Sequence, residues 1–600
     1  MDRNSLLGLL LIGLIMVGST YYFKPDPATQ EPVKNAQRLD STKSNAKSTP
    51  SASKINPIAQ TSLGDVNASA WIAPTSSDTS DTLSLENENI KIYFSSLGGM
   101  PIKAELKNYL TWQKKSLVLF DNNQFYFQIP SYLGVKGTHQ IAFNSKVSNP
   151  NSLEFYALAS DGSTVTLKWR LKPNSYSTSL ESSFNFAANN AQVNTSNLSL
   201  RWISNTNGKE KNRQNERDNA TVYYQNSASG EVDKLNPIGF DSLASSEHFS
   251  WIAFKQQFFT TAIVPQKPLL PGGLISTRPG AEVDDVKSFS AMFNVDHKLA
   301  DKSPAKFDFY FGPNHYQTLK EAGHDLQQQI PLGWGIFGWV NKFLVIPVFN
   351  WLDAYGLNYG IVILFLTLII KLVLFPFQFK SYLSQAKMRV LKPEMDELNK
   401  KYENEDALKK QQALMALYKE AGVNPLGGCF PLLLQLPILL AMFNFFPNAI
   451  ELRQQSFLWA DDLSTFDSIL TLPFEIPVYG DHVSLFALLM TISTIIYTMM
   501  NNSLSVQNDQ MKQMKWMMYL MPVVFLLVLN SYAAGLNYYY FLANIITFGQ
   551  QFAFSKLVDE KKIHAKIQAN KLKPASQKTS SFQQKLEEMA KKRGYNPPKK

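Results

Sequence analysis

Long apolar runs alternate with polar segments in the second half of the chain. The most continuous one, residues 359–377, contains 19 residues with Lys371 as its only charged side chain. About 20 apolar residues in a helix cross a hydrocarbon core of ~30 Å. Four more apolar runs cover residues 423–446, 483–500, 516–530 and 534–555. The pattern therefore predicts five transmembrane helices within residues 359–557.

A further apolar run lies near the amino terminus, where residues 5–18 follow Arg3. A signal peptide and a membrane anchor both fit this pattern. We favour a transmembrane anchor over residues 1–23, because the segment approaches spanning length and ends in tyrosines that suit a membrane interface. The anchor makes six transmembrane helices in all. Residues 24–80 are rich in Ser, Thr, Pro, Asn and Lys, and predict a disordered linker.

Between residues 81 and 327 the pattern changes to short runs of alternating apolar and polar residues. Examples are IKIYF (90–94) and KFDFYF (306–311), and the runs are separated by Gly, Asn, Asp and Pro turns. Period-two alternation with β-branched and aromatic residues predicts a large all-β, sandwich-like domain. Its histidines have neither metal-ligand nor catalytic-triad spacing, so we expect no metal site and no catalytic site there.

Three tryptophans mark the stretch between the β domain and the first core helix. Residues 328–358 carry Trp334, Trp339 and Trp351 at helical spacing on a mixed apolar segment. This pattern predicts an amphipathic helix that lies in the membrane interface. Burial against the β domain is the competing interpretation.

The polar segment after the first core helix has helical periodicity of its own. Residues 379–425 hold nine Lys/Arg and seven Asp/Glu, and predict a helical hairpin in water. The next connection, residues 447–481, holds one basic and six acidic residues. The positive-inside rule then places the hairpin and both termini in the cytoplasm, and the second connection and the β domain outside.

A lysine within a membrane helix is a functional-site hypothesis by default, because an ammonium at the bilayer centre costs at least ~2.5 kcal/mol. Lys371 shares one helix face with Thr367 and Gln378, as expected if that face lines a hydrated space. Snorkelling to the interface is the alternative, since Phe377 at the end of the run is only six residues away.

Polar side chains recur at helical spacing in the other apolar runs. Gln435 lies near the middle of 423–446, and hydroxyl and amide residues form stripes in two later runs. Such residues can be interhelical packing contacts, but their recurrence in several helices favours an inward-facing hydrophilic groove. The candidate groove residues are Lys371, Thr367, Gln435, Thr491, Thr494, Thr498, Tyr540, Asn544 and Thr547.

The excess positive charge lies at the carboxyl terminus. The chain has 58 Lys+Arg and 48 Asp+Glu, a net of +10, and residues 561–600 alone hold 12 basic and 2 acidic residues. With few large apolar side chains, residues 558–600 predict a basic cytoplasmic tail that forms no core. Anionic lipid and RNA phosphates are both candidate partners. The single cysteine, Cys429, excludes an intrachain disulfide.

The segment VNPLGGCFPLLLQLP (423–437), preceded by AKMRVLKP (386–393), closely resembles the YidC family of membrane protein insertases. With GLNYYYFLANIITFGQQ (535–551), the resemblance covers about residues 359–557. A large domain after an amino-terminal anchor is similar to the diderm bacterial type, in which that domain is periplasmic. One position departs from the pattern, because many members have arginine where this chain has Lys371, so the charge is kept but the planar five-donor fork is lost.

The resemblance implies a non-enzymatic insertase of the bacterial inner membrane, without cofactors, which inserts and folds nascent membrane proteins through the groove. Partners implied are nascent membrane proteins, lipids, the ribosome through the tail, and the general Sec translocase. Contact residues on the hairpin would be Met388, Arg389, Lys392 and Met415, and those of the tail Lys561, Lys562, Lys591, Lys592 and Arg593. A transporter or an envelope carbohydrate-binding membrane protein is the alternative from the residues alone.

Overall fold

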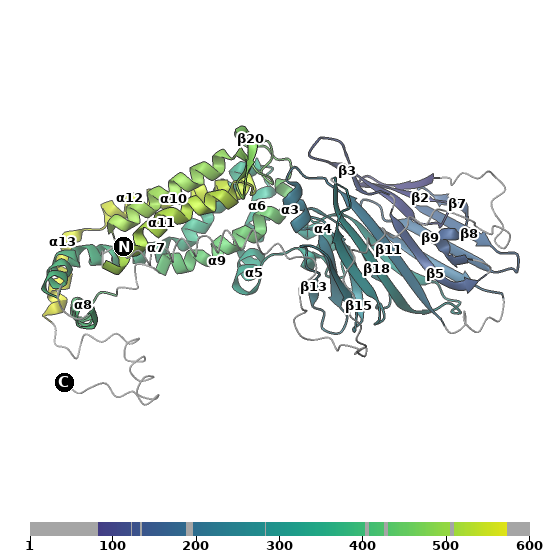
Figure 1. Ribbon diagram of the computed structural model, residues 1–600, viewed down its shortest axis with the longest axis horizontal. Helices are drawn as coiled ribbons and strands as arrows, with labels where there is room; N and C mark the ends of the chain where they lie inside the picture. Colours follow the sequence, from purple (N-terminus) through teal and green to yellow (C-terminus); the bar gives the residue numbers. More distant parts are fainter. Residues whose placement is uncertain are drawn as a thin grey trace, which may run out of the picture. The chain divides into compact units, whose positions relative to one another are not determined.

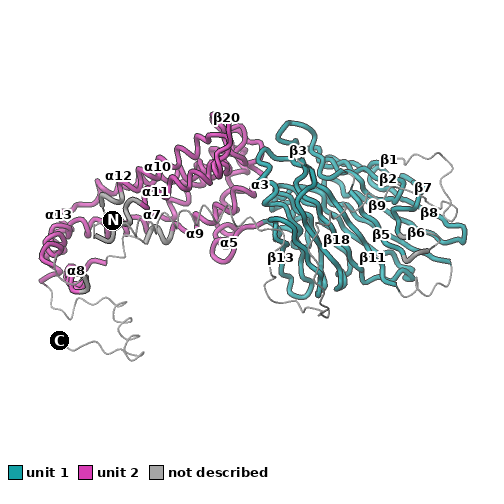
Figure 2. Tube along the Cα trace, viewed as in Figure 1, with its two compact units in different colours: residues 1–330 teal, residues 331–600 magenta. Residues whose placement is uncertain are grey.

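The computed structural model describes residues 82–572 apart from 122, 133–134, 188–195, 283, 403–406, 425–429 and 505–508. The predicted anchor (1–23), the predicted linker (24–80) and Cys429 lie outside the described residues. The chain divides into two compact units, residues 1–330 and 331–600 (Figure 2). Each unit is described by itself below.

The first unit is built almost entirely of antiparallel strands, as the period-two pattern predicts (Figure 1). Its nine-stranded sheet contains, in spatial order, β13 (Val232–Lys234), β12 (Thr221–Asn226), β15 (Phe249–Lys255), β16 (Phe259–Pro265), β19 (Ala305–Pro313), β10 (Ser177–Asn185), β9 (Thr164–Leu171), β8 (Ser152–Leu158) and β7 (Asn144–Asn149). Its six-stranded sheet contains β14 (Asp241–Ala244), β17 (Leu274–Pro279), β18 (Asp285–Lys298), β11 (Asn197–Asn207), β5 (Gln124–Tyr132) and β6 (Val135–Gly137).

Smaller elements complete this unit. A four-stranded sheet contains β1 (Thr82–Glu86), β2 (Ile90–Ser95), β3 (Pro101–Leu110) and β4 (Ser116–Phe120). The helices are short, namely η1 (Thr138–Gln140), α3 (Arg213–Asp218), α4 (Tyr316–Ala322) and η2 (Leu326–Gln329).

Aromatic side chains from the two large sheets meet in the core between the sheets. Trp202 of β11 stacks on Phe254 of β15 with ring centroids 4.0 Å apart, and Phe125 of β5 meets Phe309 of β19 at 5.3 Å. Successive residues of β9 and β11 alternate between buried and partly exposed, so one face of each strand supplies this core. The predicted large β domain is therefore confirmed, and its interior is mainly apolar.

The second unit is helical. It contains α5 (Gly335–Val340), the π-helical η3 (Asn341–Val345), α6 (Ile346–Asp353), α7 (Tyr359–Lys401), α8 (Ala407–Ala421), α9 (Phe430–Phe445), η5 (Phe446–Asn448), η6 (Ile450–Leu452), α10 (Leu485–Leu504), α11 (Asp509–Leu529), α12 (Ala534–Leu557) and α13 (Glu560–Lys571). A two-stranded hairpin, β20 (Leu470–Ile476) and β21 (Gly480–Val483), precedes α10.

Two helical stretches of the described chain are long and apolar enough to cross a membrane, Gly335–Asp353 and α7. The apolar parts of α10 and α11, Leu485–Met500 and Met517–Leu529, are shorter. The first stretch falls within the segment predicted to be an interfacial helix, in which Trp334, Trp339 and Trp351 are exposed, whereas the buried Asn341 donates to the Ala441 carbonyl of α9 at 2.8 Å. The number of six transmembrane helices remains a prediction.

Helix α7 differs from the predicted boundary between a membrane helix and a separate hairpin. It continues for 43 residues through Pro376 and Pro393, so the first arm of the hairpin is the extension of the lysine helix. Proline costs one backbone hydrogen bond inside a helix but does not have to end it when packing supports both sides. Lys371 and the first arm of the hairpin therefore belong to one continuous helix.

The carboxyl-terminal segment also differs from the prediction. Residues 560–571 form helix α13, with Asp559 as its N-cap, and Ile563 and Ile567 are buried. The prediction that the tail forms no core is wrong for these residues, because two isoleucines four positions apart give the helix an apolar edge. Residues 573–600, including Lys591, Lys592 and Arg593, lie outside the described residues.

Candidate functional site

Lys371 is buried in the helical unit, with 2% of its surface exposed. Its Nζ donates a hydrogen bond to Thr547 Oγ1 of α12 at 2.8 Å. The ammonium thus lies against a neighbouring helix instead of snorkelling to an interface. Within the described part of the chain Lys371 forms no ion pair, so its charge has no carboxylate counterpart.

Helix α12 supplies a second contact to the lysine. Gln550, one turn after Thr547, donates from Nε2 to the Lys371 carbonyl oxygen at 3.4 Å. Thr547 Oγ1 also donates to the Ala543 carbonyl at 2.6 Å, so its lone pairs remain available to the ammonium. The spacing of Thr547 and Gln550 places both on the edge of α12 that faces α7.

A small polar pocket of about 30 Å³ is lined by Thr547, the partner of Lys371, although Lys371 itself is not part of the lining. This space suits about two water molecules, which need some 10–15 Å³ each. Its lining comes from α7, α9, α10 and α12, and consists of Gln378, Ser381, Tyr382, Gln385, Gln435, Tyr497, Thr547, Gln550, Gln551 and Phe554. The amide oxygens of Gln378 and Gln550 are buried and accept no hydrogen bond from the described residues, which indicates water in the pocket.

The structure brings some predicted groove residues together by contacts between helices. Asn544 of α12 donates to Ser493 Oγ at 2.9 Å and to Thr494 Oγ1 at 3.0 Å, both on α10. Tyr540 donates from its hydroxyl to the Leu439 carbonyl of α9 at 2.8 Å. Together with the contact between Lys371 and Thr547, these bonds connect α12 to α7, α9 and α10.

Three predicted threonines make a different contribution. Thr367, Thr491 and Thr498 donate their hydroxyl protons to carbonyls four residues earlier in their own helices, at 2.6, 2.8 and 2.8 Å. Such bonds satisfy a hydroxyl without linking two helices. None of the three lines the pocket, whereas Gln435 does.

Sequence reasoning missed part of the pocket wall. Ser381 and Gln385 follow Gln378 at spacings of three and seven residues, so they continue the polar face of Lys371. They were assigned to the charged hairpin because the apolar run ends near Phe377. Ser493, which accepts from Asn544, lies next to the predicted stripe of threonines on α10.

The predicted hairpin is a three-helix cluster, since α13 packs against both of its arms. Ile563 and Ile567 share a buried apolar cluster with Ala386, Leu391, Met395, Leu414, Leu417, Ala421 and Val423. Arg389 of α7 forms an ion pair with Glu560 at 3.5 Å, and Lys571 forms one with Glu394. Asn570 donates to the Ala421 carbonyl of α8 at 3.4 Å.

In this arrangement some of the predicted contact residues of the hairpin are packed against other side chains and others are exposed. Met388 packs against the apolar cluster, and Arg389 stacks over the Tyr382 ring at 5.4 Å. Lys392 and Met415 are exposed, Met415 by 52%. On α13, Lys561 and Lys562 are exposed.

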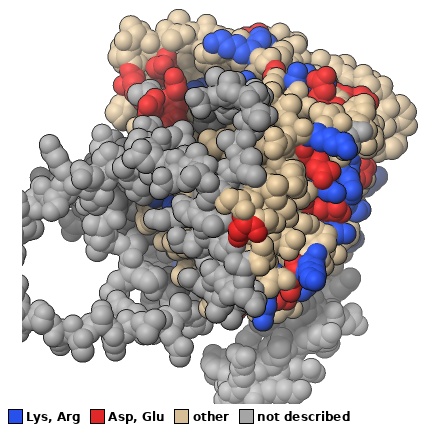
Figure 3. All heavy atoms as spheres, turned by 90° about the vertical axis from the view of Figure 1, so that its right-hand side faces the viewer, with Lys and Arg blue, Asp and Glu red and all other residues tan. Residues whose placement is uncertain are grey.

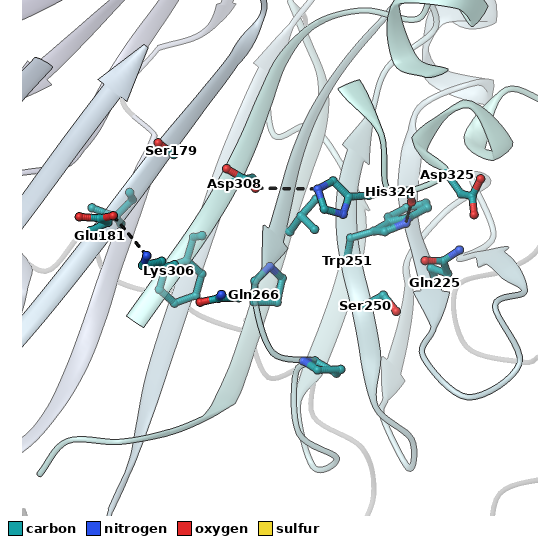
Figure 4. A pocket seen from close by; sticks show the side chains of 15 residues that line it. Ser179, Glu181, Gln225, Ser250, Trp251, Gln266, Lys306, Asp308, His324 and Asp325 are labelled. Atoms are coloured by element: carbon teal, nitrogen blue, oxygen red, sulfur yellow. Dashed lines mark hydrogen bonds and ion pairs between the residues drawn. The ribbon is translucent and has the colours of Figure 1, made fainter. Parts of the chain in front are cut away.

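The β unit contains a larger pocket, of about 470 Å³, over strands β10, β16 and β19 (Figure 4). Its charged groups pair with one another: Glu181 with Lys306 at 3.5 Å, and Asp308 with His324 at 3.8 Å. Trp251, at its wall, is fully buried and donates to the His324 carbonyl. These are pairwise contacts on a sheet surface and form no nucleophile–base–orienter arrangement.

Basic and acidic side chains are interspersed on the face of the molecule drawn in Figure 3. Ion pairs between neighbouring strands of the β unit include Lys168 with Glu154 at 3.5 Å. The described part of that face therefore lacks the single-sign charge of a polyanion-binding surface.

Two protein families match the chain: the 60Kd inner membrane protein family over residues 351–562, and the YidC periplasmic domain over residues 82–347. The chain is 37% identical over 606 residues to the membrane protein insertase YidC of Bacteroides fragilis strain ATCC 25285. This alignment covers 98% of this chain and 97% of the relative. It is 36% identical to the protein of the same name from Amoebophilus asiaticus, with 100% of both chains covered. The crystal structure of an active YidC insertase with its first transmembrane domain resolved aligns with 18% identity and a TM-score of 0.32, over 79% of this chain and 92% of that chain.

Proposed function

The chain belongs to the YidC family of membrane protein insertases, and from this premise we propose that Lys371 and the pocket beside it form its hydrophilic client groove. Membrane insertion is the function of the family, it involves no enzymatic step, and its clients are nascent membrane proteins. This membership sets aside the transporter and carbohydrate-binding alternatives. The protein resides in the inner membrane and has a periplasmic domain.

The observation that carries the groove assignment is the buried, unneutralised ammonium of Lys371 next to a polar pocket. A charge in this place keeps water inside the bilayer thickness and attracts acidic residues of a client. The short polar segment of a client would enter from the cytoplasm, while its apolar segment leaves into lipid beside α9 and α10. Hydrophobic partitioning and the membrane potential would drive the transfer.

The pocket is too small for a polypeptide in this conformation, since it holds only about two water molecules. Client entry therefore requires the lining helices to separate, and we infer that α9 moves away from α12. The contact that would have to break is the hydrogen bond from Tyr540 to the Leu439 carbonyl. Gln435, on the same helix as Leu439, would then face the widened space.

The remaining assignments follow from the charge distribution. The proposed topology has six transmembrane helices. Both chain termini, the helical hairpin and the tail are then cytoplasmic, and the β unit is periplasmic. Met415 and Lys392 form the exposed receiving surface of the hairpin. The tail beyond α13, with Lys591, Lys592 and Arg593, binds the ribosome, and Lys561 and Lys562 extend this basic surface. The Sec translocase is a further proposed partner.

A depletion–complementation assay tests the groove charge. Lys371→Arg should support growth and insertion of a reporter membrane protein, because it retains the positive charge. Lys371→Met should reduce insertion by at least about tenfold, corresponding to about 1.4 kcal/mol or more. Lys380→Met is the matched control, since Lys380 is an exposed lysine on the same helix. Full insertion activity in Lys371→Met would exclude the proposed role of the charge.

A further inference from the structure

The connection between α9 and α10 presents large apolar side chains on its outside. Ile469, Leu470, Phe474 and Val478 are 50%, 56%, 62% and 42% exposed. Scattered exposed apolar residues are normal, but four of them within ten residues form a patch. They belong to or border the hairpin β20–β21, which has only two strands and would be marginally stable alone.

Buried polar side chains attach this hairpin to the helices. Asn530 donates from Nδ2 to the carbonyls of Tyr479 and His482 at 2.9 and 2.8 Å, and its Oδ1 accepts from the Ser484 amide at 2.9 Å. Asp467 accepts from the Phe486 amide at 3.0 Å. These bonds fix β21, from the turn residue Tyr479 to Ser484, to the end of α11 and the start of α10, without use of the exposed apolar side chains.

The tip of the hairpin has an unfavourable backbone conformation. Val478 has a φ of 71°, in the left-handed region that β-branched residues strongly avoid. Strain of this kind persists where the surrounding structure holds it, and it is concentrated at functional segments. Here it holds an apolar side chain at the outer end of the turn.

Exposed apolar side chains also occur on α10 and α11, the helices to which the hairpin is attached. Residues Ile492 and Ile496 of α10 are 53% and 43% exposed, and Val528 at the end of α11 is 42% exposed. Val528 is two residues before Asn530, which holds the hairpin. In the view of Figure 1 the hairpin lies at the end of α10 and runs across the direction of this helix, as expected for a segment parallel to a membrane surface.

The length of α10 brings this end close to the hydrocarbon. Its apolar part, Leu485–Met500, has 16 residues. At 1.5 Å per residue it is about 24 Å long, less than the ~30 Å of a typical hydrocarbon core. A hairpin attached at residue 484 therefore lies within reach of the acyl chains, because the hydrocarbon core is thicker than the apolar part of α10 is long.

We propose that the β20–β21 hairpin is a membrane anchor that immerses Leu470, Phe474 and Val478 among the acyl chains of the adjacent leaflet. This leaflet is the periplasmic one in the topology proposed above. Lipid fits the patch better than a protein partner does, because α10 and α11, to which the hairpin is attached, also expose apolar side chains, and the apolar part of α10 is shorter than the hydrocarbon core. Immersion would fix the depth of α10 in the membrane, and α10 is hydrogen-bonded to α12 through Thr494 and Asn544.

Spin labels in nanodiscs test the proposal with the full-length chain. Cys429 is the only cysteine, so Cys429→Ser gives a background for Leu470→Cys and Phe474→Cys. Collisions with O₂, which concentrates in acyl chains, are compared with those of a water-soluble nickel chelate. Ile496→Cys serves as the lipid reference, Lys302→Cys in the β unit as the aqueous reference, and the exposed neighbour Glu475→Cys as the matched control.

We expect the ratio of O₂ to nickel collisions at residues 470 and 474 to resemble that at residue 496 and to exceed that at residues 475 and 302 several-fold. Labels at 470 and 474 that collide with nickel as freely as the label at 302 would overturn the proposal. Labels shielded from both reagents would also overturn it, because they would show a protein partner on the patch. The side of the membrane is tested separately, by labelling Glu475→Cys with an impermeant thiol reagent in intact cells.

Discussion

The ammonium of Lys371 has more donors than the protein satisfies. A lysine carries three N–H donors, and the described residues supply one side-chain acceptor, Thr547 Oγ1. Two donors therefore remain for water or for a client carboxylate. An arginine at this position would offer five donors in a plane, so the lysine provides charge with less demand on client geometry.

Thr547 should matter more than the other buried threonines. Thr547→Val removes the partner of a buried ammonium, which costs about 1–3 kcal/mol, so insertion activity and thermal stability should both fall. Thr491→Val is the matched control, because the Thr491 hydroxyl is also buried but bonds only to the Ala487 carbonyl of its own helix. Equal losses in reporter insertion for the two variants would argue against a specific role for the contact with Lys371.

Lys255 is a second buried lysine, in the β unit. It is 1% exposed, donates to the Gln256 carbonyl at 3.3 Å, and lies 5.7 Å from the Tyr223 ring centroid. Burial, with the nearby charge of Lys234, lowers the pKa of Lys255 to about 7. In the unfolded chain the pKa of a lysine is about 10.4, so the unfolded state binds this proton more tightly.

The sign of the pH dependence follows from this difference. Between about pH 7 and 10 the contribution of Lys255 to folding stability improves as pH rises, and below about pH 7 its destabilising effect is complete. Lys255→Met should stabilise the β unit at pH 6 by on the order of 5 kcal/mol, at about 1.4 kcal/mol per pKa unit. Calorimetry of the full chain should show this gain decreasing towards pH 10, and a gain independent of pH would contradict the assignment.

Helix α13 depends on its contacts with the hairpin. Twelve residues are too few for a stable isolated helix in water, so the buried Ile563 and Ile567 and the ion pairs with Arg389 and Glu394 stabilise it. The hairpin is stabilised in return, since α7 and α13 are the elements that pack most extensively against α8 among those described. The cytoplasmic cluster is therefore a cooperative unit of three helices.

Ile567→Asp should separate α13 from the hairpin. Burying a carboxylate in an apolar cluster costs several kcal/mol, so amide exchange in α8 should accelerate by at least about tenfold. Ala565→Asp introduces the same charge at an exposed position of the same helix and should leave exchange in α8 unchanged. Unaltered exchange in Ile567→Asp would show that α13 does not stabilise the hairpin.

At the scale of the whole molecule, the position of α13 changes how the tail should be tested. Truncation after Lys556 would remove α13 and disturb the hairpin, so loss of ribosome binding could not be attributed to the basic tail. Truncation after Leu572 keeps every buried residue of the cluster. It removes residues 573–600, which contain eight of the 12 basic residues counted from 561 onwards.

The chain truncated after Leu572 should sediment with translating ribosomes less than the full-length chain does. The difference should shrink as salt is raised, because phosphate contacts release counterions and weaken with ionic strength. Amide exchange in α8 serves as the folding control and should not change. Equal sedimentation of both chains over the whole salt series would assign the tail to the lipid surface.

Local patterns in the sequence determined which parts of this protein are β-sheet, membrane helix and charged hairpin. The period-two runs predicted the β unit, and the apolar run around Lys371 predicted both a membrane helix and a site within it. These predictions depend on neighbours within one helix turn or one strand, where spacing alone decides which side chains share a face. The YidC resemblance likewise rests on contiguous residues.

Only the tertiary structure decided which of these residues meet. Thr547, the partner of Lys371, is 176 residues away, and the docking surface of α13 is formed by α7 and α8. The sequence marked Thr367, Thr491 and Thr547 alike, and all three hydroxyls donate to their own helices, yet only Thr547 among them also accepts from the ammonium. Helical periodicity specifies the face on which a side chain lies, whereas its partner depends on how separate helices pack, and that packing is set by many weak contacts at once.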